Sequence, residues 1–64
     1  MTYRIEGSGP QWLESNALAA ESAVGALERS HAVRMVYGQA MVFDDSGRRL
    51  SPSELMARAE AELA

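Results

Sequence analysis

Hydrophobic and polar positions alternate at the start of the chain, where Tyr3 and Ile5 are apolar and their neighbours are polar. A period of two is typical of a strand with one buried face. The segment Gly7-Ser8-Gly9-Pro10 follows and is expected to end this strand. The first predicted element is therefore a short strand.

Apolar positions then recur at steps of three and four, which is the period of a helix with one buried face. The predicted buried face consists of Leu13, Ala17, Ala20, Val24, Leu27 and His31, and the opposite face carries Glu14, Glu21, Glu28 and Arg29. Two starts fit this helix. Ser8 and Gln11 can form a capping box around Pro10, or Ser15 or Asn16 can cap a later helix and leave 11–13 as a second strand. We favour the earlier start.

The segment from 32 to 43 is dense in β-branched, aromatic and sulfur-containing side chains. This composition predicts strands at 32–37 and 40–43, joined by a two-residue turn at Gly38-Gln39. The alternative is a single strand bent by a bulge at Gly38. With either interpretation, Asp44-Asp45-Ser46-Gly47 is predicted to reverse the chain into a short strand at 48–50.

The strongest local signal is the start of the last helix. The Ser51 hydroxyl can accept a hydrogen bond from the amide of Glu54, whose carboxylate can reach back to the amide of Ser51. Pro52 suits the first helical position, where no amide proton is needed. The helix is predicted to place Leu55, Met56, Ala59 and Leu63 on one face and Glu54, Arg58 and Glu62 on the other.

Together these elements predict a single small α+β domain over residues 1–64. Its expected chain order is strand, helix, strand, strand, short strand, helix. Each helix has one apolar face and the sheet has at least one. We therefore expect a two-layer sandwich, in which an antiparallel sheet of three to four strands is covered on one face by both helices.

Composition narrows the chemistry of this domain. The chain has no cysteine and one histidine, so we expect no disulfide, no metal site and no cofactor. Six arginines face nine carboxylates, for a net charge of −3, which argues against a general nucleic-acid binder. No apolar run is long enough to cross a membrane and the N-terminus lacks a secretory pattern, so a cytoplasmic location is expected. The abundant alanine and the exclusive use of arginine as cation are typical of GC-rich bacterial or phage genomes.

Candidate catalytic groups are few. His31 lacks a partner in any recognisable nucleophile motif, and its expected role is to face the carbonyl end of the first helix. Asp44-Asp45-Ser46 does not follow the spacing of a calcium loop and is interpreted as a turn. We therefore predict no catalytic residue.

Candidate partner contacts are the aromatic and arginine side chains. Arg34, Arg48 and Arg49 can form a phosphate or carboxylate clamp with Tyr37 and Phe43 on neighbouring strands, although charge that protects a strand edge is the more common role. The single tryptophan, Trp12, is more often part of a core than an anchor for a partner.

The favoured function is a non-enzymatic bacterial or phage protein that acts by protein–protein contact, as a regulator, adaptor or inhibitor. A chain of this size buries only about 60% of its unfolded surface, so a homodimer is expected to add burial. Two alternatives remain open. One is a nucleic-acid-associated module with a local arginine patch, and the other is a small-molecule binder or enzyme whose site forms at a subunit interface.

Overall fold

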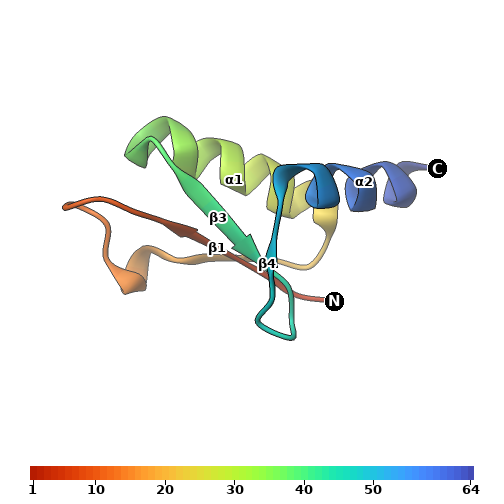
Figure 1. The fold of residues 1–64 in the computed structure, drawn as a ribbon, viewed down its shortest axis with the longest axis horizontal. Coiled ribbons are helices and arrows are strands. Elements are labelled where there is room, and N and C mark those ends of the chain that lie inside the picture. The colour runs from red at the N-terminus through yellow and green to blue at the C-terminus, as the bar shows by residue number, and fades with distance from the viewer.

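The computed structural model describes all 64 residues as a sheet with two helices (Figure 1). The strands are β1 (Tyr3–Gly7), β2 (Leu18–Ala20), β3 (Ala40–Phe43) and β4 (Arg49–Leu50). The helices are α1 (Ala23–Tyr37) and α2 (Pro52–Leu63), and a single 3₁₀ turn spans Glu14–Asn16.

The sheet is antiparallel throughout, with the strand order β2-β1-β3-β4. Both helices cover the same face of it, as the edge-on view shows (Figure 1). The predicted α+β class, with two helices on one face of an antiparallel sheet, is confirmed. The other face of the sheet has no second layer, and its cross-strand row contains Arg4, Phe43 and Arg49.

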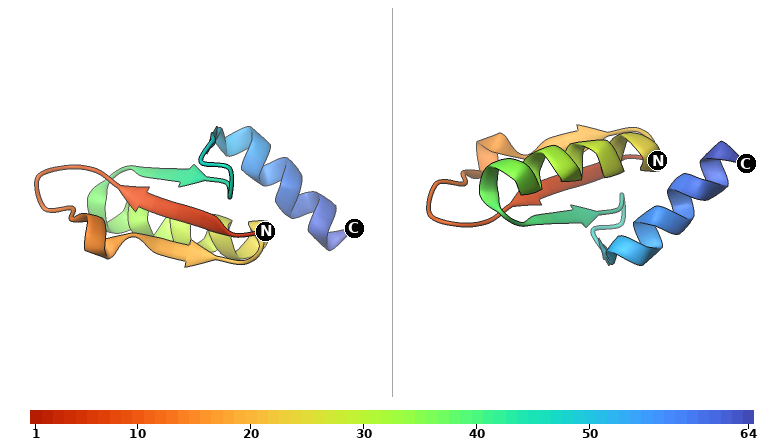
Figure 2. Two further views of the ribbon diagram at one scale, coloured as in Figure 1. Left: turned by 90° about the horizontal axis from the view of Figure 1, so that it is seen from below. Right: turned by 90° about the horizontal axis from the view of Figure 1, so that it is seen from above.

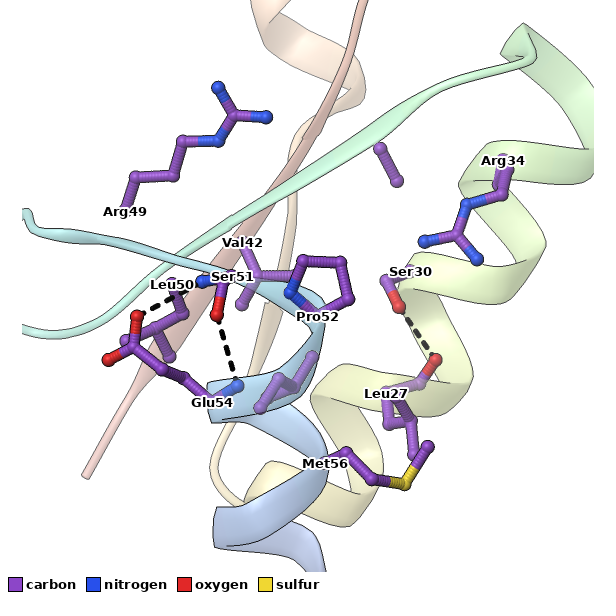
Figure 3. A pocket seen from close by; sticks show the side chains of 12 residues that line it. Leu27, Ser30, Arg34, Val42, Arg49, Leu50, Ser51, Pro52, Glu54 and Met56 are labelled. Atoms are coloured by element: carbon purple, nitrogen blue, oxygen red, sulfur yellow. Dashed lines mark hydrogen bonds between the residues drawn. The ribbon is translucent and has the colours of Figure 1, made fainter.

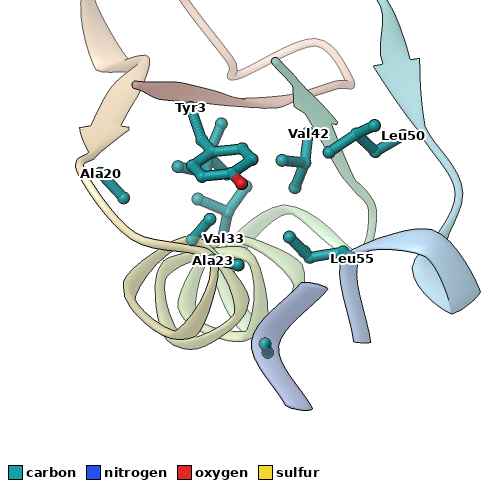
Figure 4. Close-up of a cluster of buried hydrophobic side chains, with 10 residues drawn as sticks. Tyr3, Ala20, Ala23, Val33, Val42, Leu50 and Leu55 are labelled. Atoms are coloured by element: carbon teal, nitrogen blue, oxygen red, sulfur yellow. The ribbon is translucent and has the colours of Figure 1, made fainter. Parts of the chain in front are cut away.

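The core lies between the sheet and the helices (Figure 4). It is thin, because Ile5 is the only large side chain that is fully buried and α1 and α2 contribute mostly alanines. The ten buried apolar residues are Tyr3, Ile5, Ala20, Ala23, Ala26, Val33, Val42, Leu50, Leu55 and Ala59.

Both predicted starts of the first helix are wrong. The helix begins at Ala23, and its N-cap is Ser22, whose side chain accepts a hydrogen bond from the amide of Gly25. The preceding residues form a loop, the 3₁₀ turn and strand β2, so Leu13 is exposed rather than buried. The buried face of α1 consists of three small residues and Val33. Because small residues dominate this face, it gives little hydrophobic periodicity. Leu13, Ala17 and Ala20, which precede the helix, fit the helical period only by chance.

The strand predicted at 32–37 is also wrong, because this segment is the last part of α1. Gly38 adopts the left-handed conformation, with φ of 83°, and its amide donates to the carbonyl of Arg34. It is therefore a helix C-cap, and neither the hairpin turn nor the bulge is present. Val33, Val36 and Tyr37 suggested a strand, but β-branched and aromatic residues are only slightly unfavourable in helices and tertiary packing overrides this preference.

The predicted turn at 44–47 and the predicted start of the last helix are confirmed, whereas Met56 and Leu63 of the predicted apolar face are exposed. Asp44 reverses the chain by accepting hydrogen bonds from the amides of Ser46 and Arg48, and Gly47 takes a positive φ of 87°. The hydrogen bonds of the capping box between Ser51 and Glu54 are both formed. These local contacts carry the chain from β3 through a five-residue turn into β4, and Ser51 alone separates β4 from α2.

Candidate functional site

The two helices touch at one end and separate at the other. At the closed end, the Glu62 carboxylate near the end of α2 accepts hydrogen bonds from the amides of Ala23 and Val24, at 2.6 and 3.0 Å. These amides belong to the first turn of α1 and have no partner within their own helix. A side chain 39 residues away in the sequence thus completes the cap that Ser22 begins.

At the open end, α2 diverges from α1 (Figure 2). Residues of both helices and of β3 and β4 line a groove there. We call this the inter-helix groove, and its volume is about 470 Å³. Leu27 and Arg34 of α1 form one wall, and Pro52 and Met56 of α2 form the other. Figure 3 shows the Met56 side chain directed toward Leu27 across the space. A hollow of this size falls within the range of about 300–1,000 Å³ that is usual for ligand sites.

The floor of the inter-helix groove is a partly uncovered strand. Strand β4 pairs with only two residues of β3, since Val42 lies opposite Leu50 and Phe43 opposite Arg49. The amide of Asp44 donates to the carbonyl of Arg48, and in an antiparallel ladder the bonded pairs alternate. Val42 and Leu50 therefore form the next bonded pair, and the backbone of Ala40 points to the same side.

Ala40 has no strand partner on that side. The residue that would continue β4 opposite it is Pro52, which has no amide proton and already belongs to α2. The edge of β3 at Ala40 thus opens into the inter-helix groove, where Ala40 is a lining residue. The unpaired edge is the single residue Ala40, and an unpaired strand edge beside apolar walls is the feature to which extended peptides bind.

The free charge of the groove is positive. Arg34 from α1 and Arg49 from β4 both line it and form no ion pair. The acidic residue of the lining, Glu54, is already engaged by the Arg48 guanidinium at 2.9 Å and by the amide of Ser51. Two unpaired arginines thus line the groove on a chain whose net charge is −3, and the exposed carboxylate of Glu28 lies in the shallow extension beside Arg34.

Hydrogen bonds lower the pKa of three carboxyl groups around this framework. The Ser46 hydroxyl, followed by the amides of Arg48 and Ser46, lowers the pKa of Asp44. The Arg48 side chain and then the Ser51 amide lower the pKa of Glu54. The amides of Ala23 and Val24 lower the pKa of Glu62. All three carboxylates hold elements in place, so their charge supports the groove rather than acting in it.

The proposed arginine clamp is divided by the fold. Arg34 and Tyr37 lie on α1, so the premise that they occupy a strand is wrong. Arg48 lies in the turn, where its side chain is engaged by Asp44 and Glu54. Arg34 and Arg49 both belong to the lining of the inter-helix groove, but Arg49 lies on the open face of the sheet and its side chain points away from Arg34 in Figure 3.

The aromatic candidates Trp12 and Tyr37 do not line the inter-helix groove. Trp12 is half-buried against Gly7, where an added Cβ would come within 2.5 Å of the Trp12 ring and 3.1 Å of Tyr37. The Tyr37 hydroxyl accepts a hydrogen bond from the Asn16 side chain at 3.0 Å. These contacts attach the loop after β1 to the end of α1, and the indole N–H of Trp12 has no partner.

His31 is not at the carbonyl end of a helix, because it lies in the middle of α1 and is exposed. The expected helix-end role is therefore wrong. Its ring lines a shallow extension of the inter-helix groove beside Glu28 and Met56. No group of three or more His, Cys, Asp or Glu residues lies close enough together to hold a metal ion.

The sequence pattern did not identify the apolar part of the groove. Met56 was predicted to face the core but is 46% exposed, and Leu27 is only partly buried. The available signal was a helix face too wide for the small core of this chain, since Leu55, Met56, Ala59 and Leu63 cannot all be covered by α1.

No family model matches the chain, and it matches no curated protein and no solved structure. Neither helix has the length and apolar character required to cross a membrane.

Proposed function

We propose that the protein is a non-enzymatic cytoplasmic interaction protein that binds a segment of another protein in the inter-helix groove. The observation that carries this proposal is the combination, in one groove, of apolar walls, an unpaired strand edge at Ala40 and two arginines without ion pairs. A regulator, adaptor or inhibitor needs such a surface and needs no reacting group.

The exposed apolar side chains support a role in contact. Met35 and Val36 are 74% and 73% exposed at the end of α1, and Met56 lies exposed in the groove itself. Large apolar side chains gathered on a surface are typical of interaction sites. In a chain with so thin a core, they contribute little to stability where they are.

Photo-cross-linking from two adjacent positions tests this function. Met56 lines the groove, whereas Ala57 is exposed and does not line it. Each is replaced in turn by the photoreactive residue p-benzoylphenylalanine, and the variants are irradiated in cells of the native host. We expect a discrete cross-linked protein from position 56 that is absent from position 57. Equal products from both positions, or none from position 56, would contradict a partner in the groove.

We also propose that the protein forms a homodimer, which would cover part of the exposed apolar surface. A standard interface buries about 800 Å² of each partner, and this chain has a total accessible surface of 4211 Å². A dimer interface of standard size would therefore cover a substantial part of its surface. Light scattering at micromolar concentration should give twice the mass of one chain, and the melting temperature should rise with concentration. A monomeric mass together with a melting temperature independent of concentration would exclude the dimer.

A further inference from the structure

We infer that the occupant of the inter-helix groove is an extended, acidic segment of a partner protein, added as a strand beside β3. This inference rests on the proposed function and specifies the partner. Three features of the groove lead to it: the direction of the free strand edge, the unpaired charge and the chemistry of the lining.

The free strand edge at Ala40 favours a partner segment with an extended backbone. Beyond Leu50, the chain leaves the sheet at Pro52, and the position opposite Ala40 is empty of strand. A peptide running antiparallel to β3, in the direction of β4, can fill this position and bond to both backbone groups of Ala40. A helix in the same place would leave these two groups unpaired.

The surroundings of the groove favour a partner segment whose side chains alternate in character along the strand. On an added strand, successive side chains point to opposite faces of the sheet. Those on the helix side meet Leu27 and Met56, which favour apolar and β-branched residues. Those on the other side lie on the open face of the sheet, to which Arg49 belongs through its pairing with Phe43.

The unpaired arginines of the groove favour acidic residues in the partner segment. Arg34 extends from α1 toward Pro52 in Figure 3, whereas Arg49 of β4 borders the groove from the open face of the sheet and its side chain points away from Arg34. Neither arginine has an ion-pair partner within the chain, so both guanidinium groups are available for a carboxylate. Contacts of this kind contribute chiefly to specificity, because a partner with lysine in these places would be repelled.

The lining disfavours nucleic acid as the occupant. None of the twelve lining residues is aromatic, although stacking on aromatic rings is the usual means of holding unpaired bases. A polyanion would also approach a chain with three more carboxylates than arginines. A peptide with a few well-placed carboxylates does not meet this general repulsion to the same degree.

Selection from a random twelve-residue peptide library displayed on phage tests the inference without assuming a partner. The purified protein is the target, and enriched peptides are synthesised with a fluorescent label. We expect them to combine Asp or Glu with β-branched or apolar residues at alternating positions. Single backbone amides of the peptide are then methylated one at a time. Methylation of the residue that pairs with Ala40 should abolish binding of the peptide.

Two charge reversals on the same helix supply the matched comparison. Arg34 and Arg29 are both exposed, both on α1 and both without an ion pair, but only Arg34 lines the groove. We expect Arg34→Glu to weaken peptide binding about tenfold or more, whereas Arg29→Glu leaves it unchanged. Both variants should melt at nearly the same temperature, because neither side chain packs in the core.

The other outcomes separate this inference from the proposed function. Peptides that compete with cross-linking at position 56 but lack acidic residues, or bind equally to Arg34→Glu, would overturn the inference and leave the groove as a partner site. Failure to enrich any peptide would also overturn it. If Arg34→Glu instead abolishes dimerisation of the free protein, the occupant is a second copy of this chain and the inference is wrong.

Discussion

The two ends of the helix pair differ in the kind of residue that lies between the helices. At the closed end, polar groups satisfy one another across the helices, since Glu62 of α2 accepts from the first amides of α1. At the open end, the Met56 side chain is directed toward Leu27 (Figure 3), and Ala40 at the edge of β3 is a further lining residue of the groove. The closed end fixes the angle between the helices, and that angle exposes the groove.

This difference indicates how a chain of 64 residues can combine a stable fold with an open apolar surface. Capping and turn contacts of Asp44, Ser51, Glu54 and Glu62 hold the elements in place at the surface. Fewer apolar residues are then required for burial. The comparison predicts that changes at structural positions alter stability, whereas changes in the groove alter binding.

The largest expected effect comes from two neighbouring residues of α2. Leu55 is 3% exposed and belongs to the core, whereas Met56 projects into the groove. Leu55→Ala should lower the free energy of unfolding by about 2–5 kcal/mol, because it leaves a cavity in a thin core. Met56→Ala should change it by only about 0.5 kcal/mol but reduce partner binding. Urea unfolding of both variants checks this, and equal destabilisation would show that Met56 is a core residue.

The next effect concerns the start of α2. Ser51→Ala should destabilise the protein by about 1 kcal/mol, because the amide of Glu54 loses its acceptor. Ser53 lies in the same first turn and is exposed, and no hydrogen bond of its side chain is formed. Ser53→Ala is therefore the control and should be nearly neutral in the same urea titration. An equal midpoint for Ser51→Ala and the wild type would place the helix boundary elsewhere.

A smaller effect is expected at the closed end, where Glu62→Gln removes the charge that faces the start of α1. The folded-state pKa of Glu62 lies below its ordinary value of 4.5 because two amides donate to the charged form. Its contribution to stability is therefore fully present above pH 4.5 and is lost as pH falls through the folded-state pKa.

Thermal melts of wild type and Glu62→Gln across acidic pH measure this contribution. The variant should melt at a lower temperature than wild type near neutral pH, and the two curves should converge in acid. Glu60→Gln removes an exposed carboxylate of α2 that makes no hydrogen bond, so it serves as the control and should follow the wild type. A constant difference between wild type and Glu62→Gln at every pH would contradict the assignment.

The smallest expected effect is on the binding of nucleic acid. Binding through the three candidate arginines would weaken with salt, with a slope of about −0.9 on a log–log scale for each duplex phosphate neutralised. We expect no measurable duplex binding at low salt, because Arg48 is engaged in ion pairs and carboxylates outnumber arginines. Micromolar, salt-sensitive binding in a titration would favour the nucleic-acid alternative over a protein partner.

The C-terminal part of the fold was predictable because its signals are local. The turn at Asp44 and the capping box at Ser51 and Glu54 each form within five residues, so the sequence alone contains every group involved. The α+β class followed from these signals and from the apolar faces of the elements.

The first helix was not predictable in the same way. Ser30 is buried on its core face, Met35 and Val36 are exposed, and Gly38 can end a helix as readily as it can form a hairpin turn. The true boundary signals were Ser22 and Gly38, which bracket the helix. Hydrophobic periodicity outweighed these cap signals in the prediction.

The groove depends on contacts that no local pattern contains. Glu62 reaches Ala23 and Val24 across 39 and 38 residues, and Ala40 is uncovered only because β4 ends where α2 begins. The sequence identified Arg34 and Arg49 as partner contacts from their chemistry. It did not show that they share a groove with Met56.

Amide exchange at Ala40 and Val42 tests the central claim most directly. Both amides point to the same side of β3, but only Val42 has a bonded partner in β4. Hydrogen exchange followed by NMR should show strong protection at Val42, little at Ala40, and new protection at Ala40 when a selected peptide is added. Equal protection of both amides in the free protein, or no change at Ala40 in the complex, would contradict an open strand edge as the partner site.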